Sequence, residues 1–265
     1  MALVAPGAAQ WCRILLSTSA KDRLFAASAA WPPTRFLWRR LERLVQPGII
    51  AHYWHRKHWI EQCCREALAA GCQRVVVAGA GFDTLALRLA PQFPQIEFVE
   101  IDHPATQREK RAAMAKHHNG LVAAGNVSFI SADFGTAPLP ISAFDDGKRT
   151  LLIMEGLLMY LAPTTVEQLF AALGGVGSQV EVVFSFMVQW DDGSCGFRPR
   201  SRWVDRWLAS REETFTWSTR SASLHSYLRT FGLSIMKRAT TRDLAALYGS
   251  SHLGLEGEEL VFARN

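Results

Sequence analysis

A glycine turn and a following acidic residue are the groups in this 265-residue sequence whose types and spacing point most directly to chemistry. The apolar run 75–78 leads into Gly79, Ala80 and Gly81, and Asp102 ends a second apolar run about 20 residues later. Glycines let the backbone approach a ligand closely, and the amide groups at a helix start favour a negative group. The acidic residue lies where it would accept hydrogen bonds from a ribose. The pattern therefore predicts a cofactor site.

The residues that follow Gly81 help to decide which cofactor this is. A dinucleotide-binding turn has a third glycine shortly after the second, whereas this sequence continues with Phe82, Asp83 and Thr84, which disfavours a pyrophosphate packed on the following helix. S-adenosylmethionine fits better, because it offers a ribose to the acidic residue and a methionine tail to the glycine turn. The alternative is a purely structural strand, turn and helix without a ligand.

Short apolar segments that alternate with helical patterns must position this turn. Helical spacing of apolar residues predicts helices over Thr84–Leu89, Ala105–His118 and Thr164–Leu173. Segments rich in Val, Ile, Leu or Phe predict strands over Arg74–Ala78, Ile96–Ile101, Val127–Ala132, Arg149–Met154 and Gln179–Phe186. Two closing strands, joined by a polar stretch, are predicted over Leu233–Ala239 and Glu259–Arg264. The alternation predicts an α/β fold with a doubly wound, mixed sheet of seven strands.

Two segments depart from this alternation. The apolar pattern of residues 1–70 is helical, which predicts an N-terminal helical cap before a main domain at 71–265. Residues 187–221 are too long for a plain loop, and segments of that length are usually lids or binding elements. Four tryptophans fall within it, at Trp190, Trp203, Trp207 and Trp217. We therefore expect an inserted substrate lid at 187–221.

Composition narrows the cellular setting. The 49% hydrophobic content allows a large core. No segment is long and uncharged enough to span a bilayer, and no basic region precedes the short apolar start, so we expect a soluble, cytoplasmic protein without a membrane partner. The five cysteines are odd in number and form no Cys-x-x-Cys pair, which supports neither a disulfide framework nor a zinc site. We expect no bound metal.

The net charge of +5 raises the question of an anionic partner. Arginines gather at 39–40 and, within the insert, at Arg198, Arg200, Arg202 and Arg206. The second group alternates with tryptophan and aspartate, and a solvated helix face explains that pattern better than a nucleic-acid surface. Nucleic acid is therefore the less favoured partner, and the oligomeric state is left open.

Three motifs occur in a specific order and spacing, namely GAGFDTL at 79–85, VEIDHP at 99–104 and EGLLMYL at 155–161. Together with Arg88-Leu89 and Lys110, they resemble the leucine carboxyl methyltransferase family, over roughly Arg56 to Phe186. The resemblance implies a class I methyltransferase fold, which is Rossmann-like, binds S-adenosylmethionine and methylates an oxygen, often of a carboxylate.

Family roles transfer to matching positions of the cofactor site. The resemblance implies that Arg56 holds the methionine carboxylate, which suits a bidentate guanidinium, and that Lys21 assists it, although a solvated side chain is the alternative for Lys21. Asp102, next to His103, would accept hydrogen bonds from the ribose hydroxyls. We expect Glu100 to point to the opposite face of its strand. Many relatives have an acidic residue two positions before the first glycine, where this chain has valine, so the cofactor would be held differently here.

The remaining roles concern the adenine, the amino end and the acceptor. By resemblance, Asp133 accepts a hydrogen bond from the adenine amino group and Phe134 stacks on the adenine ring. The alternative is that Asp133 caps a helix and Phe134 is a core residue. Glu155 would reach the cofactor's amino end. Met159 and Tyr160 would face the transferring methyl group or the acceptor, and Tyr160 is the weak catalytic candidate, because its hydroxyl could equally be bonded within the core.

The acceptor is where the sequence is least informative. The insert predicts a pocket for a small apolar or aromatic acid, with Arg198 and Trp203 as contacts. A carboxylate acceptor is already ionised at neutral pH and needs no general base, whereas His103, His225 and His252 are the histidine candidates for a phenol or alcohol. The alternatives are a scaffold that binds the cofactor without methylating, as in a natural-product rearrangement, and a nucleic-acid methyltransferase.

Overall fold

A computed structural model of the chain describes residues 5, 7–16, 24, 27–28, 31–116, 125–136, 138–210, 214–249 and 254–265. Lys21 and His252, two residues with roles suggested above, lie outside these ranges. In the described part of the chain, no helix has both the length and the apolar character needed to cross a membrane.

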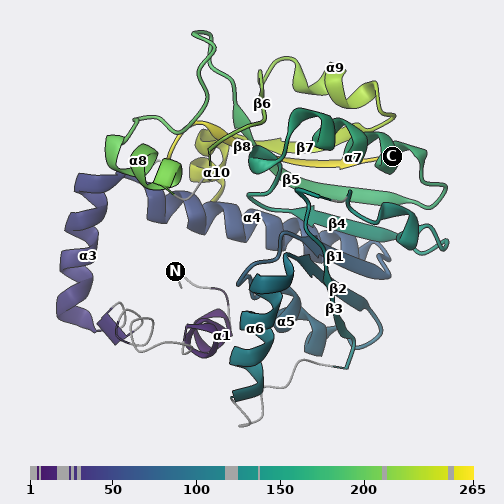
Figure 1. The fold of residues 1–265 in the computed structure, drawn as a ribbon, viewed down its shortest axis with the longest axis horizontal. Helices are drawn as coiled ribbons and strands as arrows, with labels where there is room; N and C mark the ends of the chain where they lie inside the picture. Colours follow the sequence, from purple (N-terminus) through teal and green to yellow (C-terminus); the bar gives the residue numbers. More distant parts are fainter. Residues whose placement is uncertain are drawn as a thin grey trace.

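One open sheet runs through the molecule in the order β3-β2-β1-β4-β5-β8-β7 (Figure 1). The strands are β1 (Arg74–Ala78), β2 (Glu97–Asp102), β3 (Val127–Ser131), β4 (Thr150–Met154), β5 (Val180–Val188), β7 (Ser234–Ala239) and β8 (Glu258–Arg264). Neighbours from β3 to β5 pair in parallel, whereas β8 is antiparallel to both β5 and β7. The predicted mixed sheet of seven strands is thus confirmed, with an additional two-residue strand β6 (Ser218–Thr219) beside β5.

Helices cover both faces of the sheet. The helices of the described residues are α1 (Ala8–Leu15), α3 (Pro32–Val45), α4 (Ile49–Ala69), α5 (Leu85–Leu89), α6 (Pro104–Lys116), α7 (Pro163–Gly175), α8 (Arg202–Ser210), α9 (Leu224–Arg229) and α10 (Thr241–Leu247), of which α3 and α8 lie away from the sheet (Figure 1). Helices α7 and α9 pack with one set of strand side chains, and α4, α5 and α10 pack with the other set. Figure 1 shows α4, the helix just before β1, lying across one face of the sheet. Its buried residues belong to the core on that face.

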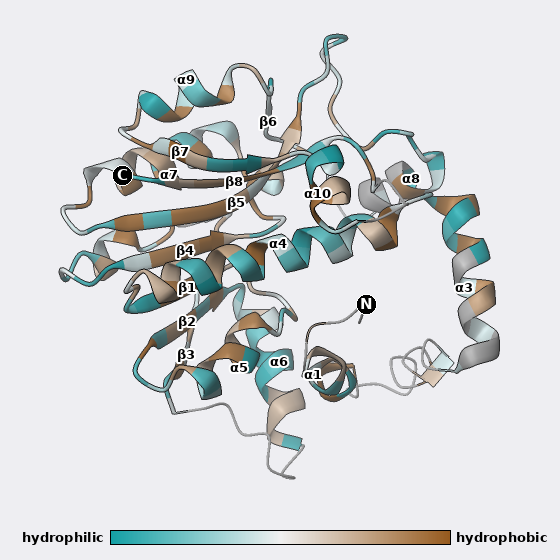
Figure 2. Ribbon diagram, turned by 180° about the vertical axis from the view of Figure 1, so that it is seen from behind, coloured by the Kyte–Doolittle hydropathy of each residue, from teal (hydrophilic) through white to brown (hydrophobic). Residues whose placement is uncertain are grey.

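The two-residue period of β1 explains how a wholly apolar strand serves both layers. Val76 and Ala78 belong to the core under α7, whereas Val75 and Val77 belong to the core under α4. All five residues of β1 are buried. The central strands are correspondingly hydrophobic in Figure 2, where brown segments run along β4 and β5. Val77, the unusual residue before the glycine turn, is therefore an ordinary core residue.

Helix α10 was not predicted, because the stretch between the closing strands is polar and short. It begins with a capping box: the Thr240 hydroxyl accepts a hydrogen bond from the Asp243 backbone N–H, and the Asp243 carboxylate accepts from the Thr240 N–H. Thr241, Leu244 and Ala245 are its buried residues. The Thr-x-x-Asp spacing was the local signal that could have revealed this helix.

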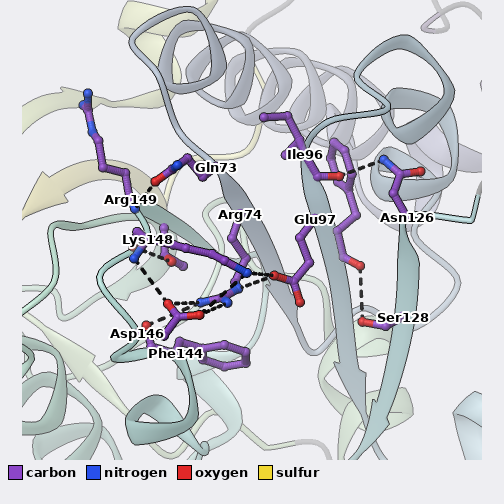
Figure 3. A network of polar contacts seen from close by, with 12 residues as sticks. Gln73, Arg74, Ile96, Glu97, Asn126, Ser128, Phe144, Asp146, Lys148 and Arg149 are labelled. Atoms are coloured by element: carbon purple, nitrogen blue, oxygen red, sulfur yellow. Dashed lines mark hydrogen bonds and ion pairs between the residues drawn. The ribbon is translucent and has the colours of Figure 1, made fainter.

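The edge of the sheet where β1 begins is fastened by an ion-pair network (Figure 3). The buried guanidinium of Arg74 donates to Glu97 on β2 at 2.8 Å and to Asp146 before β4 at 2.5 Å. Lys148 also contacts Glu97, at 3.1 Å. This network joins three neighbouring strands at the edge opposite the glycine turn, which leaves the turn's edge available for a ligand.

Candidate active site

The glycine turn lies at the carboxyl ends of the central strands, next to the point where the chain leaves β1 for β2 on one side and β4 lies on the other. Gly79 has a φ of +67°, and a side chain there would meet Leu157 at 3.1 Å. Gly81 has a φ of +47°, yet a Cβ at that position would meet nothing within 4 Å. Backbone conformation therefore favours glycine at both positions, and the space beside Gly81 is open to a ligand.

Asp102 holds the turn from the end of β2. Its Oδ2 accepts a hydrogen bond from the Gly81 N–H at 2.5 Å, and its Oδ1 accepts from the His103 N–H at 2.6 Å. The side chain is partly exposed, so the remaining lone pairs of the carboxylate are accessible. This is a suitable position for accepting hydrogen bonds from a ribose.

The expectation for Glu100 was wrong in its reason. Residues 100 and 102 are two apart, so they point to the same face of β2; burial is what distinguishes them. Glu100 is 1% exposed, and its Oε2 lies 2.6 Å from Lys110 Nζ on α6. Lys110 Nζ also donates to the Asp83 carbonyl at 2.7 Å. Glu100 is thus a buried support for the glycine turn, whereas Asp102 faces the edge.

The Asp83 carboxylate is occupied within the protein. Its Oδ1 accepts from the Leu85 N–H at 2.5 Å, at the start of α5, and its Oδ2 forms an ion pair with Lys57. Burial alone would raise the pKa of Asp83, but Lys57 and these hydrogen bonds lower it to about 2. Asp83 is therefore ionised and links α4 to the turn.

Arg56 on α4 lies between two carboxylates. Its Nε donates to Glu155 Oε1 at 2.8 Å, at the end of β4, and its Nη1 lies 3.0 Å from both oxygens of Glu258 on β8. Lys57 Nζ contacts the other oxygen of Glu155, also at 3.0 Å. The structure therefore brings the predicted Arg56 and Glu155 together at the edge that carries the glycine turn.

Glu258 is a neighbour of Arg56 that sequence reasoning missed, as is Lys57. Its carboxylate is fully buried, and its Oε2 lies 2.5 Å from His52 Nε2, a residue 206 positions away. Burial raises the pKa of Glu258, but Arg56 first and then His52 outweigh it and lower the pKa to about 2. His52 had no carboxylate partner nearby in sequence, and only the pairing of β8 with β5 supplies one.

The predicted adenine residues lie beside the end of β3. His103 Nε2 and Asp133 Oδ2 are 4.0 Å apart, and both side chains are about half exposed. Phe134 is partly buried against the core under α7 and lines a mainly apolar pocket. The other residues of this pocket are Pro138, Leu139, Leu157, Leu161, Thr165, Gln168, Leu169 and Ala172.

Met159 and Tyr160 follow the end of β4. Met159 is buried, and its carbonyl accepts from the Thr216 N–H at 2.8 Å, which ties the turn to the insert. Tyr160 is 38% exposed, and its ring centroid lies 5.7 Å from that of Phe215. Phe215 in turn contacts Phe197, with 6.2 Å between the ring centroids. Aromatic rings from the insert thus continue from Tyr160.

The two insert residues predicted to contact substrate lie differently. Arg198 donates to Asp192 at 2.8 Å, and its guanidinium stacks over the Trp190 ring at 4.2 Å. Its backbone also bridges to Glu256, just before β8. Trp203 on α8 is 70% exposed. Neither residue contacts the Arg56–Glu155 pair in the described structure.

His55, on the same helix as Arg56, is expected to lower the stability of the protein in acid. Its ring is buried, and in the described part of the chain both nitrogens lack a hydrogen-bond partner, while the ring stacks on Tyr248 at 5.7 Å. Burial, and then the neighbouring His52 and His58, lower its pKa from 6.5. The unfolded chain therefore binds a proton that the folded chain does not, and stability falls as the pH drops below the unfolded value.

We expect His55→Phe to remove the loss of folding stability that protonation of His55 causes at low pH. Urea unfolding at several pH values should show the variant gaining stability relative to the wild type as the pH falls from 7 to 5. The exposed His225→Gln on α9 is the matched control and should follow the wild type. Parallel pH profiles for His55→Phe and wild type would contradict the assignment.

The strand order and the glycine turn after β1 are those of the class I methyltransferase fold, and this fold defines the class of protein. A solved structure from Thermobifida fusca YX, provisionally described as a methyltransferase, has this fold with a TM-score of 0.56 and 16% identity, covering 97% of this chain and 94% of that one. The likeness over almost the full length of both chains confirms the predicted fold.

The comparisons with known sequences identify the family. The pattern of the leucine carboxyl methyltransferase family matches residues 10–174, which is more than half of the chain. The chain belongs to the leucine carboxyl methyltransferase family. This confirms the resemblance carried by the three motifs.

Curated relatives give a cofactor. Proteins from Mycobacteroides abscessus and Mycobacterium tuberculosis, provisionally named S-adenosyl-L-methionine-dependent methyltransferases, are each 30% identical to this chain over 180 and 181 residues. The matches cover 65% of this chain and 56% of each relative, so the chain spans little more than half of their length. Their names agree with S-adenosylmethionine as the ligand expected at the glycine turn.

Proposed function

We propose that this protein is an S-adenosylmethionine-dependent O-methyltransferase that acts on a small molecule, most favourably a carboxylate. The observation that carries the proposal is the gathering of Asp102, Arg56 and Glu155 around the open glycine turn, in a chain of the leucine carboxyl methyltransferase family. These groups match the ribose, carboxylate and ammonium of the cofactor in charge and in hydrogen-bonding type.

The residues present fit this cofactor. The space beside Gly81 lets the ligand approach the backbone, and Asp102 offers acceptor positions to ribose hydroxyls. Among the described residues, Arg56 Nη2 makes no hydrogen bond, so it remains for a carboxylate. Asp133 and Phe134 would hold the adenine beside the apolar pocket. Bound here, the cofactor supplies an electrophilic methyl group on a sulfonium.

The acceptor side favours an apolar or aromatic acid. Tyr160, Phe215 and Phe197 form a row of rings, and the half-exposed Tyr53 stacks on Arg56, with 4.5 Å between the guanidinium and the ring centroid. Flat apolar surfaces of this kind suit an aromatic ligand. We propose that residues 187–221 act as the lid that supplies this wall, with Arg198 and Trp203 at its outer part.

Positioning accounts for most of the chemistry. Displacement from a sulfonium releases a neutral thioether, and a carboxylate nucleophile is already ionised at neutral pH, so neither an acid nor a base is required. The protein's task is to align the acceptor oxygen with the methyl group and to exclude water. We propose that Tyr160 orients the acceptor, because it follows the end of β4 and is partly exposed.

A product assay tests the proposal. The purified protein is incubated with S-adenosylmethionine and a panel of aromatic and aliphatic carboxylic acids and phenols, and methylated products are detected by mass spectrometry. Methyl esters that mild alkali hydrolyses are the expected products, whereas alkali-stable methyl ethers would indicate phenol acceptors. Cofactor binding without product from any acceptor, including RNA, would favour a non-methylating scaffold.

A further inference from the structure

We propose that Glu258 is a positioning residue, which fixes Arg56 in the orientation that receives the amino-acid end of the cofactor. Glu258 lies on the last strand, outside the three family motifs and outside the residues 10–174 that match the family. The inference rests on the proposed role of Arg56 and extends it to a second residue that does not itself contact the ligand.

Glu258 is built into the protein interior. Its side chain is 0% exposed, and both of its oxygens lie 3.0 Å from Arg56 Nη1. His52 Nε2 approaches Oε2 at 2.5 Å, and the Ser185 hydroxyl on β5 also lowers the pKa of the Glu258 carboxyl. A buried carboxylate paired with Arg56 and His52 has one orientation, because any rotation would leave charges and donors unpaired.

The orientation of Arg56 follows from this arrangement. Arg56 Nη1 donates to Glu258 and Arg56 Nε donates to Glu155. Arg56 Nη2 is the nitrogen without a hydrogen bond among the described residues. Gly156 borders the guanidinium, since a Cβ there would lie 3.7 Å from both Nη1 and Nη2. The planar guanidinium is therefore held at two of its three nitrogens, and the third is directed by geometry alone.

Arg56 connects Glu258 with the turn after β4. Its guanidinium bonds Glu258 through Nη1 and Glu155 through Nε, and Gly156, the next residue, donates its N–H to Ser185 Oγ on β5 at 2.8 Å. Glu258 thus supports the guanidinium and, through it, the carboxylate proposed to meet the cofactor's ammonium, and neither of the groups that would recognise the nucleoside.

This division gives a sharp test. S-adenosylhomocysteine has the amino-acid end, whereas 5′-methylthioadenosine keeps the adenine, ribose and thioether but lacks it. By calorimetric titration, Glu258→Gln should weaken S-adenosylhomocysteine binding about 10- to 100-fold, as expected for a charge-assisted contact, and change methylthioadenosine affinity by less than about twofold. Glu259→Gln, the neighbouring residue that pairs with Arg238 at 2.5 Å and bonds Ser221, is the matched control and should leave both affinities unchanged.

A double variant tests whether Glu258 acts through Arg56. Arg56→Met should itself weaken S-adenosylhomocysteine selectively, and adding Glu258→Gln to it should cause no further loss. An equal loss of both ligands in Glu258→Gln, no loss of either, or full additivity of the two substitutions would overturn the proposal. If Arg56→Met binds S-adenosylhomocysteine normally, the role of Arg56 fails and that of Glu258 with it; methyl transfer itself is not at issue in these titrations.

Glu258→Asp carries the same test if the glutamine variant does not fold. It keeps the buried charge that Arg56 and His52 require, but withdraws the carboxylate from Nη1 by one methylene. A selective loss of S-adenosylhomocysteine binding is expected, smaller than for Arg56→Met. Unchanged affinity for both ligands would overturn the positioning role.

Discussion

Replacing Asp102 by alanine is expected to weaken the binding of S-adenosylmethionine and S-adenosylhomocysteine by about 100-fold or more. The substitution removes the acceptor proposed for the ribose and also frees the Gly81 and His103 N–H groups, which Asp102 holds at 2.5 and 2.6 Å. The glycine turn would then lose its orientation together with its ligand contact. Isothermal titration calorimetry with both ligands measures the effect.

The matched control for Asp102 lies on the same strand. Glu97→Ala removes an acidic residue at the other end of β2, where it pairs with Arg74 at 2.8 Å, far from the turn along the strand. We expect it to leave cofactor affinity within about twofold and to lower stability modestly. Asp102→Asn should fall between wild type and alanine, because its amide keeps one acceptor oxygen. Wild-type affinity in Asp102→Ala would place the ribose elsewhere.

Replacing Lys110 by methionine is expected to destabilise the fold by about 3–5 kcal/mol at pH 8, the cost of leaving one partner of a buried ion pair uncompensated. Lys110 and Glu100 are each 1% exposed, and 2.6 Å separates Nζ from Oε2. The substitution also removes the donor to the Asp83 carbonyl at 2.7 Å. Urea unfolding, with its midpoint and slope, measures the change.

The pH dependence of that variant identifies the cause. Burial raises the pKa of Glu100 to about 7 even with Lys110 present, and removing Lys110 raises it further. Between the unfolded pKa near 4.5 and the folded value, the folded state keeps a proton that the unfolded state has lost, so stability falls as the pH rises through this window. Lys110→Met should therefore be far more stable at pH 5 than at pH 8, relative to the wild type.

Two further variants separate charge from packing. The double variant Glu100→Gln/Lys110→Met contains no buried charge and should recover most of the lost stability at pH 8. Lys148→Met, which removes a lysine that is 45% exposed and pairs with Glu97, should cost no more than about 1 kcal/mol. A double variant no more stable than Lys110→Met would show that the lost packing, and not the charge, is responsible.

The strand order along the chain could be predicted from local residue patterns. Short runs such as Val75–Ala78 are apolar and β-branched, and glycine, proline or polar residues end them, so the seven main strands were located to within two residues. Helix α10 was not predicted, because it has only seven residues and its capping box is the one local signal of a helix. Strand β6 escaped because two residues carry no pattern at all.

The sequence by itself determined the glycine turn, the acidic residue that ends β2 and the motifs that imply the family, because each depends on neighbours within a few residues. Only the tertiary structure decided which carboxylates are buried. The pairing of β8 with β5 brings Glu258 next to His52 and Arg56. The packing of α6 brings Lys110 next to Glu100, with which it forms an ion pair. The sequence does not show whether a carboxylate is solvated by water or paired with an arginine. That depends on strands and helices that are distant along the chain.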